Sequence, residues 1–73
     1  MEKLKKTLMQ LFPAIDFDQE KHLYSDGILD SFAMVEIVSV LADEFGVYLS
    51  MEYLVPENFE SIESIWKMVQ DLK

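Results

Sequence analysis

The sequence predicts a single all-α domain over residues 1–73, with three main helices, one short helix and a long first loop. Apolar residues recur with the period of an α-helix in three segments, and no segment alternates strictly between apolar and polar residues as a half-buried strand would. With 51% hydrophobic residues in 73, the chain can form one core but is too short for two. Helices this short are marginal alone, so their apolar faces must pack together.

The first helix is predicted at the N-terminus. Leu8, Leu11 and Phe12 follow Leu4 at spacings that place all four on one helical face, with lysines on the other face. Pro13 disfavours helical geometry at Phe12, so the helix should end near that residue.

A long loop is predicted over residues 14–29, because no helical period persists there. Its turn-forming residues are Asp16, Asp18, Ser25, Asp26 and Gly27. The apolar residues expected to hold it on the core are Ile15, Phe17, Leu23 and Ile28.

The second helix should begin at Asp30 or Ser31, because either side chain can accept a hydrogen bond from a free N–H of the first turn. It should end at Gly46, which tolerates a positive φ. The residues expected to face the core are Val35, Val38, Leu41 and Phe45. The acids expected to face water are Glu36, Asp43 and Glu44.

The C-terminal part should contain a short helical turn and the last helix. Pro56 suits the first position of a turn that runs through Phe59, and Ser61 can open the helix that follows. The apolar residues that share a face of this last helix are Ile62, Ile65, Trp66, Val69 and Leu72.

The formal charge of -8 is unevenly distributed, because every lysine lies before His22 or after Trp66 and the sequence between them is acidic. Such a surface is a poor match for nucleic acid, so we expect no nucleic-acid partner. An acidic field favours encounter with basic protein patches, although the same charge can serve only to keep the protein in solution.

Several kinds of chemistry lack the residues that they need. The chain has no cysteine and one histidine, which argues against a thiolate metal site and against an acyl-transfer triad. We therefore expect no catalytic and no metal-binding residues. No apolar run reaches the length of a signal-peptide core or a membrane span, so we expect no membrane insertion and a cytoplasmic location.

Ser31 has two possible roles. A serine between an acid and an apolar run is typical of a helix cap. A hydroxyl at a helix N-terminus also lies at the positive end of the macrodipole, where a phosphate ester would gain electrostatic support. The residues alone leave both roles open.

The stretch Asp26-Gly27-Ile28-Leu29-Asp30-Ser31-Phe32, followed by Val35-Glu36, resembles the prosthetic-group site of acyl carrier and peptidyl carrier proteins. The usual form in that family is Gly-x-Asp-Ser-Leu or Leu-Asp-Ser, with Val-Glu four and five positions past the serine. The resemblance covers essentially the whole chain, since length, helix order and the long first loop also agree. It predicts a small four-helix bundle of the acyl-carrier type.

The resemblance implies that Ser31 carries 4′-phosphopantetheine, which a separate phosphopantetheinyl transferase takes from coenzyme A. Asp30 would help that transferase and its magnesium to engage the site. The thiol of the arm would hold an acyl or aminoacyl group as a thioester, and the protein would present this cargo without being an enzyme. The implied partners are the transferase, an adenylating acyl or aminoacyl ligase, and an acyltransferase or synthase that accepts the cargo.

The second helix would supply the docking face. The candidate partner-binding residues are Phe32, Met34, Glu36, Ile37, Asp43 and Glu44. The three apolar members of this set can instead widen the buried face of the helix.

Departures from the family pattern bear on the cargo. Fatty-acid carriers usually continue from the serine as Leu-Asp followed by Ser or Thr, whereas Phe32, Ala33 and Met34 follow here, and Ala42 stands where a Glu is frequent. The Leu-Asp-Ser-Phe and Pro-Glu-Asn-Phe segments look more like free-standing D-alanyl carriers of teichoic acid modification, or stand-alone aminoacyl carriers. The alternative function is a small acidic interaction module, in which Ser31 only caps a helix. A small core favours a monomer in either case.

Overall fold

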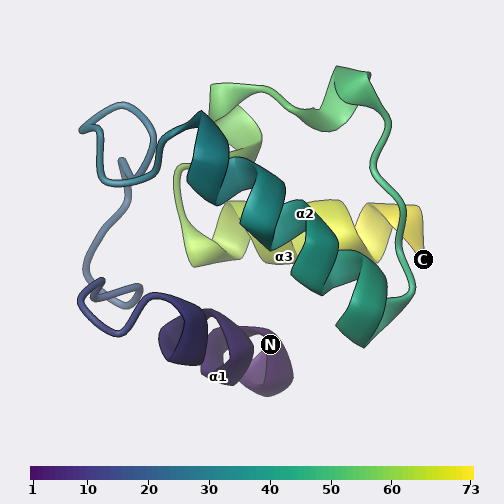
Figure 1. The fold of residues 1–73 in the computed structure, drawn as a ribbon, viewed down its shortest axis with the longest axis horizontal. Coiled ribbons are helices and arrows are strands. Elements are labelled where there is room, and N and C mark those ends of the chain that lie inside the picture. Colours follow the sequence, from purple (N-terminus) through teal and green to yellow (C-terminus); the bar gives the residue numbers. More distant parts are fainter.

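The computed structural model describes residues 1–73 and is entirely helical, with no strand (Figure 1). The elements, in chain order, are α1 (Glu2–Leu11), α2 (Ser31–Phe45), the 3-10 helices η1 (Met51–Tyr53) and η2 (Pro56–Phe59), and α3 (Ile62–Leu72). The predicted helix order and the short turn at Pro56 are confirmed, while the single turn η1 was not predicted. None of these helices combines the length and the apolar character that crossing a membrane requires.

The three α-helices surround one core. In Figure 1, α2 crosses in front of α3, α1 lies below them, and the long first loop runs up one side from α1 to the start of α2. Fifteen buried apolar residues from all three helices, from η2 and from the loops form the core. The short helices are therefore stabilised by the contacts between their apolar faces, as expected for elements of this length.

The first helix and the loop largely match the prediction. Leu4 and Leu8 are fully buried as predicted, whereas the prediction was wrong for Leu11, which ends α1 and is exposed. The next residue, Phe12, leaves helical geometry ahead of Pro13 and packs against the core. The loop is held by three buried side chains, Phe17, Leu23 and Leu29, while Ile15 and Ile28 are only partly buried.

The buried face of α2 differs from the prediction. Its buried residues are Ala33, Met34, Ile37 and Leu41. The prediction was wrong for Val35, which is 63% exposed, whereas Leu41 is buried as expected and Val38 and Phe45 are partly buried. Apolar residues lie nearly all the way round this helix. The predicted face and the observed face, which are rotated by about 100° from each other, therefore both show apolar residues at the helical period. Packing against the rest of the fold selects between them.

The ends of the helices follow their expected capping residues. Gly46 ends α2 with φ 66°, and its N–H donates to the Ala42 carbonyl oxygen. Ser61 caps α3 by accepting a hydrogen bond from the Ser64 N–H at 3.1 Å. Pro56 begins η2, and Phe59 at its end is fully buried. The predicted face of α3 is confirmed and is extended by Met68.

Both termini contact the C-terminal end of α2 at Phe45. The Lys3 and Lys73 ammonium groups lie 5.3 and 5.6 Å from the centroid of its ring, and the Trp66 ring packs edge-on against it at 6.1 Å. Lys3 also donates a 3.0 Å hydrogen bond to the carbonyl oxygen of Glu44, at the negative end of the α2 dipole.

Candidate functional site

The N-terminus of α2 is capped by Asp30. Its backbone is extended, with φ -109° and ψ -175°, and its Oδ1 atom accepts a hydrogen bond from the Ala33 N–H at 2.8 Å. Its carbonyl oxygen accepts the first main-chain bond of the helix, from Met34. Of the two residues that could have capped this helix, the acid does so and the serine does not.

Ser31 is the first residue of α2, and its side chain is exposed. Its hydroxyl makes no hydrogen bond within the chain. The one side-chain hydrogen bond at this helix start is accepted by Asp30. The backbone N–H groups of Ser31 and Phe32 also have no acceptor in the protein. An accessible hydroxyl therefore lies beside two free N–H donors at the positive end of a helix, which suits a phosphate group.

The loop in front of the site is folded by its own backbone. Gly27 adopts φ 76°, and its N–H donates to the Tyr24 carbonyl oxygen at 3.0 Å. The Leu29 N–H then donates to the carbonyl oxygen of Leu23 at 2.8 Å, which closes the loop just before Asp30. A Cβ at Gly27 would meet no other atom within 4 Å, so this turn is open to its surroundings.

Glu60 holds this loop from the other end of the chain. Its Oε1 accepts hydrogen bonds from the N–H groups of Tyr24 and Ser25, both at 2.9 Å, and its Oε2 accepts one from the Ser25 hydroxyl. These bonds lower the pKa of Glu60, the Ser25 hydroxyl being the largest cause. Sequence reasoning missed this role, since Glu60 is one acid among many and its partners lie more than thirty positions away.

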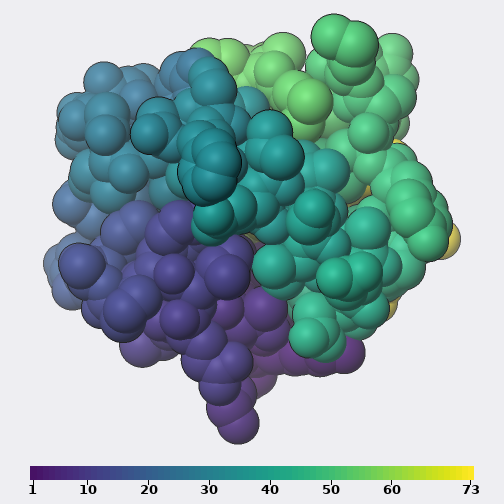
Figure 2. Space-filling view, in the orientation of Figure 1, coloured from purple at the N-terminus to yellow at the C-terminus, as the bar shows by residue number.

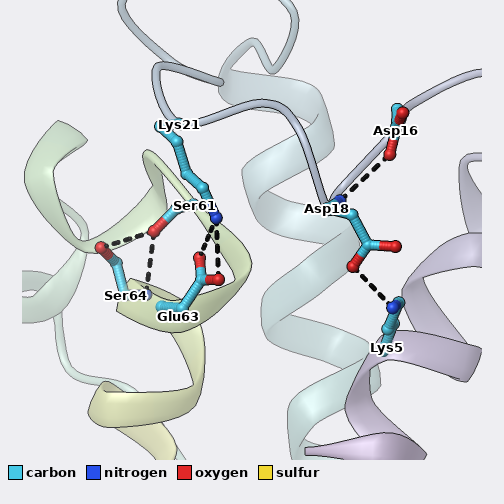
Figure 3. A network of polar contacts seen from close by, with 7 residues as sticks. All are labelled: Lys5, Asp16, Asp18, Lys21, Ser61, Glu63 and Ser64. Carbon is cyan, nitrogen blue, oxygen red and sulfur yellow. Dashed lines mark hydrogen bonds and ion pairs between the residues drawn. The ribbon is translucent and has the colours of Figure 1, made fainter.

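Two ion pairs anchor the first half of the same loop (Figure 3). Asp18 pairs with Lys5 of α1. Lys21 pairs with Glu63 in the first turn of α3, with Nζ 2.9 and 2.8 Å from its two carboxylate oxygens. The Lys21 contact lowers the pKa of Glu63. The long loop is thus tied to both the first and the last helix before it reaches the site.

The predicted partner-binding residues separate into exposed and buried groups. Phe32 is 73% exposed, and Asp43 and Glu44 are exposed as well. Glu36 is partly exposed.

The structure corrects the other two apolar candidates. Met34 and Ile37 are buried and belong to the core, so they widen the buried face of α2 and do not form an external contact surface. Val35, which the sequence predicts to face the core, is instead exposed one turn from Ser31. In the space-filling view, part of α2 forms the surface between α1 and the segment that contains η1 and η2 (Figure 2).

Comparison with known proteins found a relative among curated sequences. The chain is 34% identical over 56 residues to a probable acyl carrier protein, PigG, from a Serratia species. The matched segment makes up 77% of this chain, which spans 64% of the relative's length. No family model and no solved structure matches the chain. This sequence similarity and the all-helical fold support a relationship of the chain to acyl carrier proteins.

Proposed function

We propose that this protein carries an acyl or aminoacyl group as a thioester on a 4′-phosphopantetheine arm attached to Ser31. The observation that carries the proposal is the division of roles at the start of α2. Asp30 caps the helix, so the Ser31 hydroxyl is exposed and has no structural partner. A serine needed only as a cap would itself accept the hydrogen bond from the first turn.

The attachment is a phosphoryl transfer whose atoms come from coenzyme A. The Ser31 oxygen forms a bond to the phosphorus that bears the pantetheine, and the bond from that phosphorus to the bridging oxygen of the diphosphate breaks. Adenosine 3′,5′-bisphosphate leaves, and the hydroxyl proton passes to a base of the transferase or to water. The product is a phosphodiester on Ser31.

The residues around Ser31 fit such a group. The free N–H groups of Ser31 and Phe32 and the positive end of the α2 dipole favour the negative phosphodiester. Asp30 lies beside the reacting hydroxyl, where its second carboxylate oxygen remains free to face the transferase and its magnesium. The chain has no cysteine, so the reactive thiol must come from the arm. The protein presents cargo and does not itself catalyse a reaction.

The partners are a phosphopantetheinyl transferase, an adenylating ligase that loads the thiol, and an acyltransferase or synthase that removes the cargo. They dock on the exposed side of α2, which offers Phe32 near the attachment site and the acids Glu36, Asp43 and Glu44 farther along. The departures from the fatty-acid pattern after Ser31 favour D-alanine or another ligase-loaded acid as cargo.

The proposal is tested by intact mass spectrometry. The purified protein is incubated with coenzyme A, magnesium and a phosphopantetheinyl transferase of broad specificity. We expect the wild type to gain the mass of one phosphopantetheine and Ser31→Ala to gain none. Ser39→Ala is the matched control, because Ser39 is another exposed serine of α2 and should leave the gain unchanged.

A folded, initially unmodified wild type that gains no mass would contradict the carrier function. Such a result would favour a small acidic interaction module. A gain that persists in Ser31→Ala would contradict the assignment of the attachment site.

A further inference from the structure

We propose that Glu60 is a positioning residue for the modification of Ser31, because it holds the loop that leads into the N-terminus of α2. The inference rests on the proposed function, since it concerns the rate at which Ser31 accepts its arm. It adds a residue outside the Asp30–Ser31 motif, almost thirty positions along the chain from the serine.

Glu60 contacts three consecutive residues of the loop. Its carboxylate accepts hydrogen bonds from the Tyr24 and Ser25 N–H groups and from the Ser25 hydroxyl. Its own carbonyl oxygen accepts a 2.8 Å hydrogen bond from the Leu23 N–H. One residue thus satisfies three main-chain donors and one hydroxyl that would otherwise have to bind water.

A continuous set of contacts leads from Glu60 to the site. From the Glu60 carboxylate the contacts run through Tyr24, whose N–H donates to Glu60 and whose carbonyl oxygen accepts the Gly27 N–H at 3.0 Å. Beside them, the Glu60 carbonyl oxygen accepts the Leu23 N–H, and the Leu23 carbonyl oxygen accepts the Leu29 N–H at 2.8 Å. Leu23 and Leu29 are both buried, so this closure is supported by core packing. Leu29 is followed directly by Asp30, the cap, and by Ser31.

Glu60 itself is fixed in place. It follows Phe59, which is fully buried, and precedes Ser61, which is buried and caps α3. The backbone of Glu60 is therefore held between two anchored residues, and its carboxylate reaches the loop from this fixed position. The Glu60 carboxylate holds Tyr24 and Ser25 directly before the turn at Gly27, so losing its contacts should loosen this turn and the approach to Ser31.

The test compares steady-state kinetics of the phosphopantetheinyl transfer for wild type, Glu60→Ala, Glu60→Gln and Ser25→Ala. Glu57→Ala is the matched control. Glu57 is an exposed acid of η2 whose side chain makes no hydrogen bond or ion pair, and its substitution removes the same charge as Glu60→Ala. The reactions are run at a temperature at which circular dichroism shows every variant to be folded. Amide hydrogen exchange at Leu29 and Ala33 is measured on the same samples.

We expect Glu60→Ala to lower kcat by about tenfold with little change in KM, because the Ser31 hydroxyl would spend less time in the position from which it reacts in the bound complex. The Leu29 N–H should exchange faster, while amides in the middle of α3 keep their rates. Glu60→Gln should restore part of kcat, since its amide oxygen can still accept the N–H bonds. Ser25→Ala should show a smaller loss, and Glu57→Ala none.

Unchanged kcat and unchanged Leu29 exchange in Glu60→Ala would overturn the positioning role and leave the proposed function standing. A raised KM with normal kcat and normal exchange would also overturn it, because Glu60 would then contact the transferase directly. If Glu60→Ala does not fold, Glu60→Gln and Ser25→Ala decide: normal kcat and normal exchange in both would overturn the proposal. A wild type that is never modified would contradict the carrier function itself.

Discussion

The Oδ1 atom of Asp30 accepts a hydrogen bond from the Ala33 N–H at 2.8 Å, and this contact makes Asp30 the cap of α2. Ser31, next to it, contributes no side-chain bond to the helix. The two neighbouring polar residues therefore have separable roles, Asp30 in stability and Ser31 in the attachment that we propose, and their substitutions should have different effects.

Substitution of Asp30 by Ala should lower the free energy of unfolding by about 1 kcal/mol, the usual cost of losing a helix cap. Ser31→Ala should change it by less than about 0.5 kcal/mol, because the hydroxyl has no partner. Urea denaturation measures both, and Asp30→Asn serves as a control that keeps the cap. An equal loss in the Ser31 and Asp30 variants would show that both side chains stabilise the helix.

The corrected face of α2 predicts opposite outcomes for two of its apolar residues. Ile37→Ala should destabilise the protein by about 2–5 kcal/mol, because it leaves a cavity among fully buried neighbours. Val35→Ala should change the free energy of unfolding by no more than about 0.5 kcal/mol, because Val35 is mostly exposed. Urea titrations of the two variants compare them directly. A larger loss for Val35→Ala would mean that the helix is rotated from this arrangement.

The lowered pKa of Glu60 predicts that its contribution to stability depends on pH. The folded state binds the proton of the Glu60 carboxyl less tightly than the unfolded state does. The contribution to stability is therefore fully present above the ordinary pKa of 4.5. It is lost as the pH falls below that value and through the lower pKa of the folded state. Glu63, whose pKa is lowered by Lys21, should act in the same direction.

The check is the free energy of unfolding of wild type and Glu60→Gln, measured in urea at steps from about pH 3 to pH 7. The difference between the two proteins should shrink as the pH falls. Glu57→Gln makes the same change in net charge and controls for general repulsion between acids. A difference that stays constant with pH would contradict the ionised Glu60 contact.

The docking that we propose through the acids of α2 predicts unequal effects of two neighbouring residues. Glu44 lies 3.6 Å from the Lys3 ammonium group, which partly neutralises it, whereas Asp43 has no such partner. Asp43→Asn should therefore lower the kcat/KM of the transferase reaction by roughly threefold, and Glu44→Gln by less. Both effects should fade in about 1 M salt, where surface charges are screened. Equal effects that persist at high salt would argue against electrostatic docking through Asp43.

The sequence by itself determined the three α-helices and the short turn at Pro56, although not the single turn η1. Capping and breaking residues act within a few positions of themselves, so Pro13, Gly46, Pro56 and Ser61 could be interpreted without the rest of the fold. The Asp30-Ser31-Phe32 motif and the acidic character of the middle of the chain were likewise local or compositional properties.

Only the tertiary structure decided which side of α2 is buried and which distant side chain holds the loop before it. Val35 and Ile37 lie on two faces with the same helical period, and packing against the other elements, which is a long-range effect, selected Ile37. The contacts of Glu60 with Tyr24 and Ser25 join residues separated by more than thirty positions, and no local pattern marks such a pair. Periodicity and capping are short-range properties of a chain, whereas the choice of face and the support of a loop arise only when distant segments pack together.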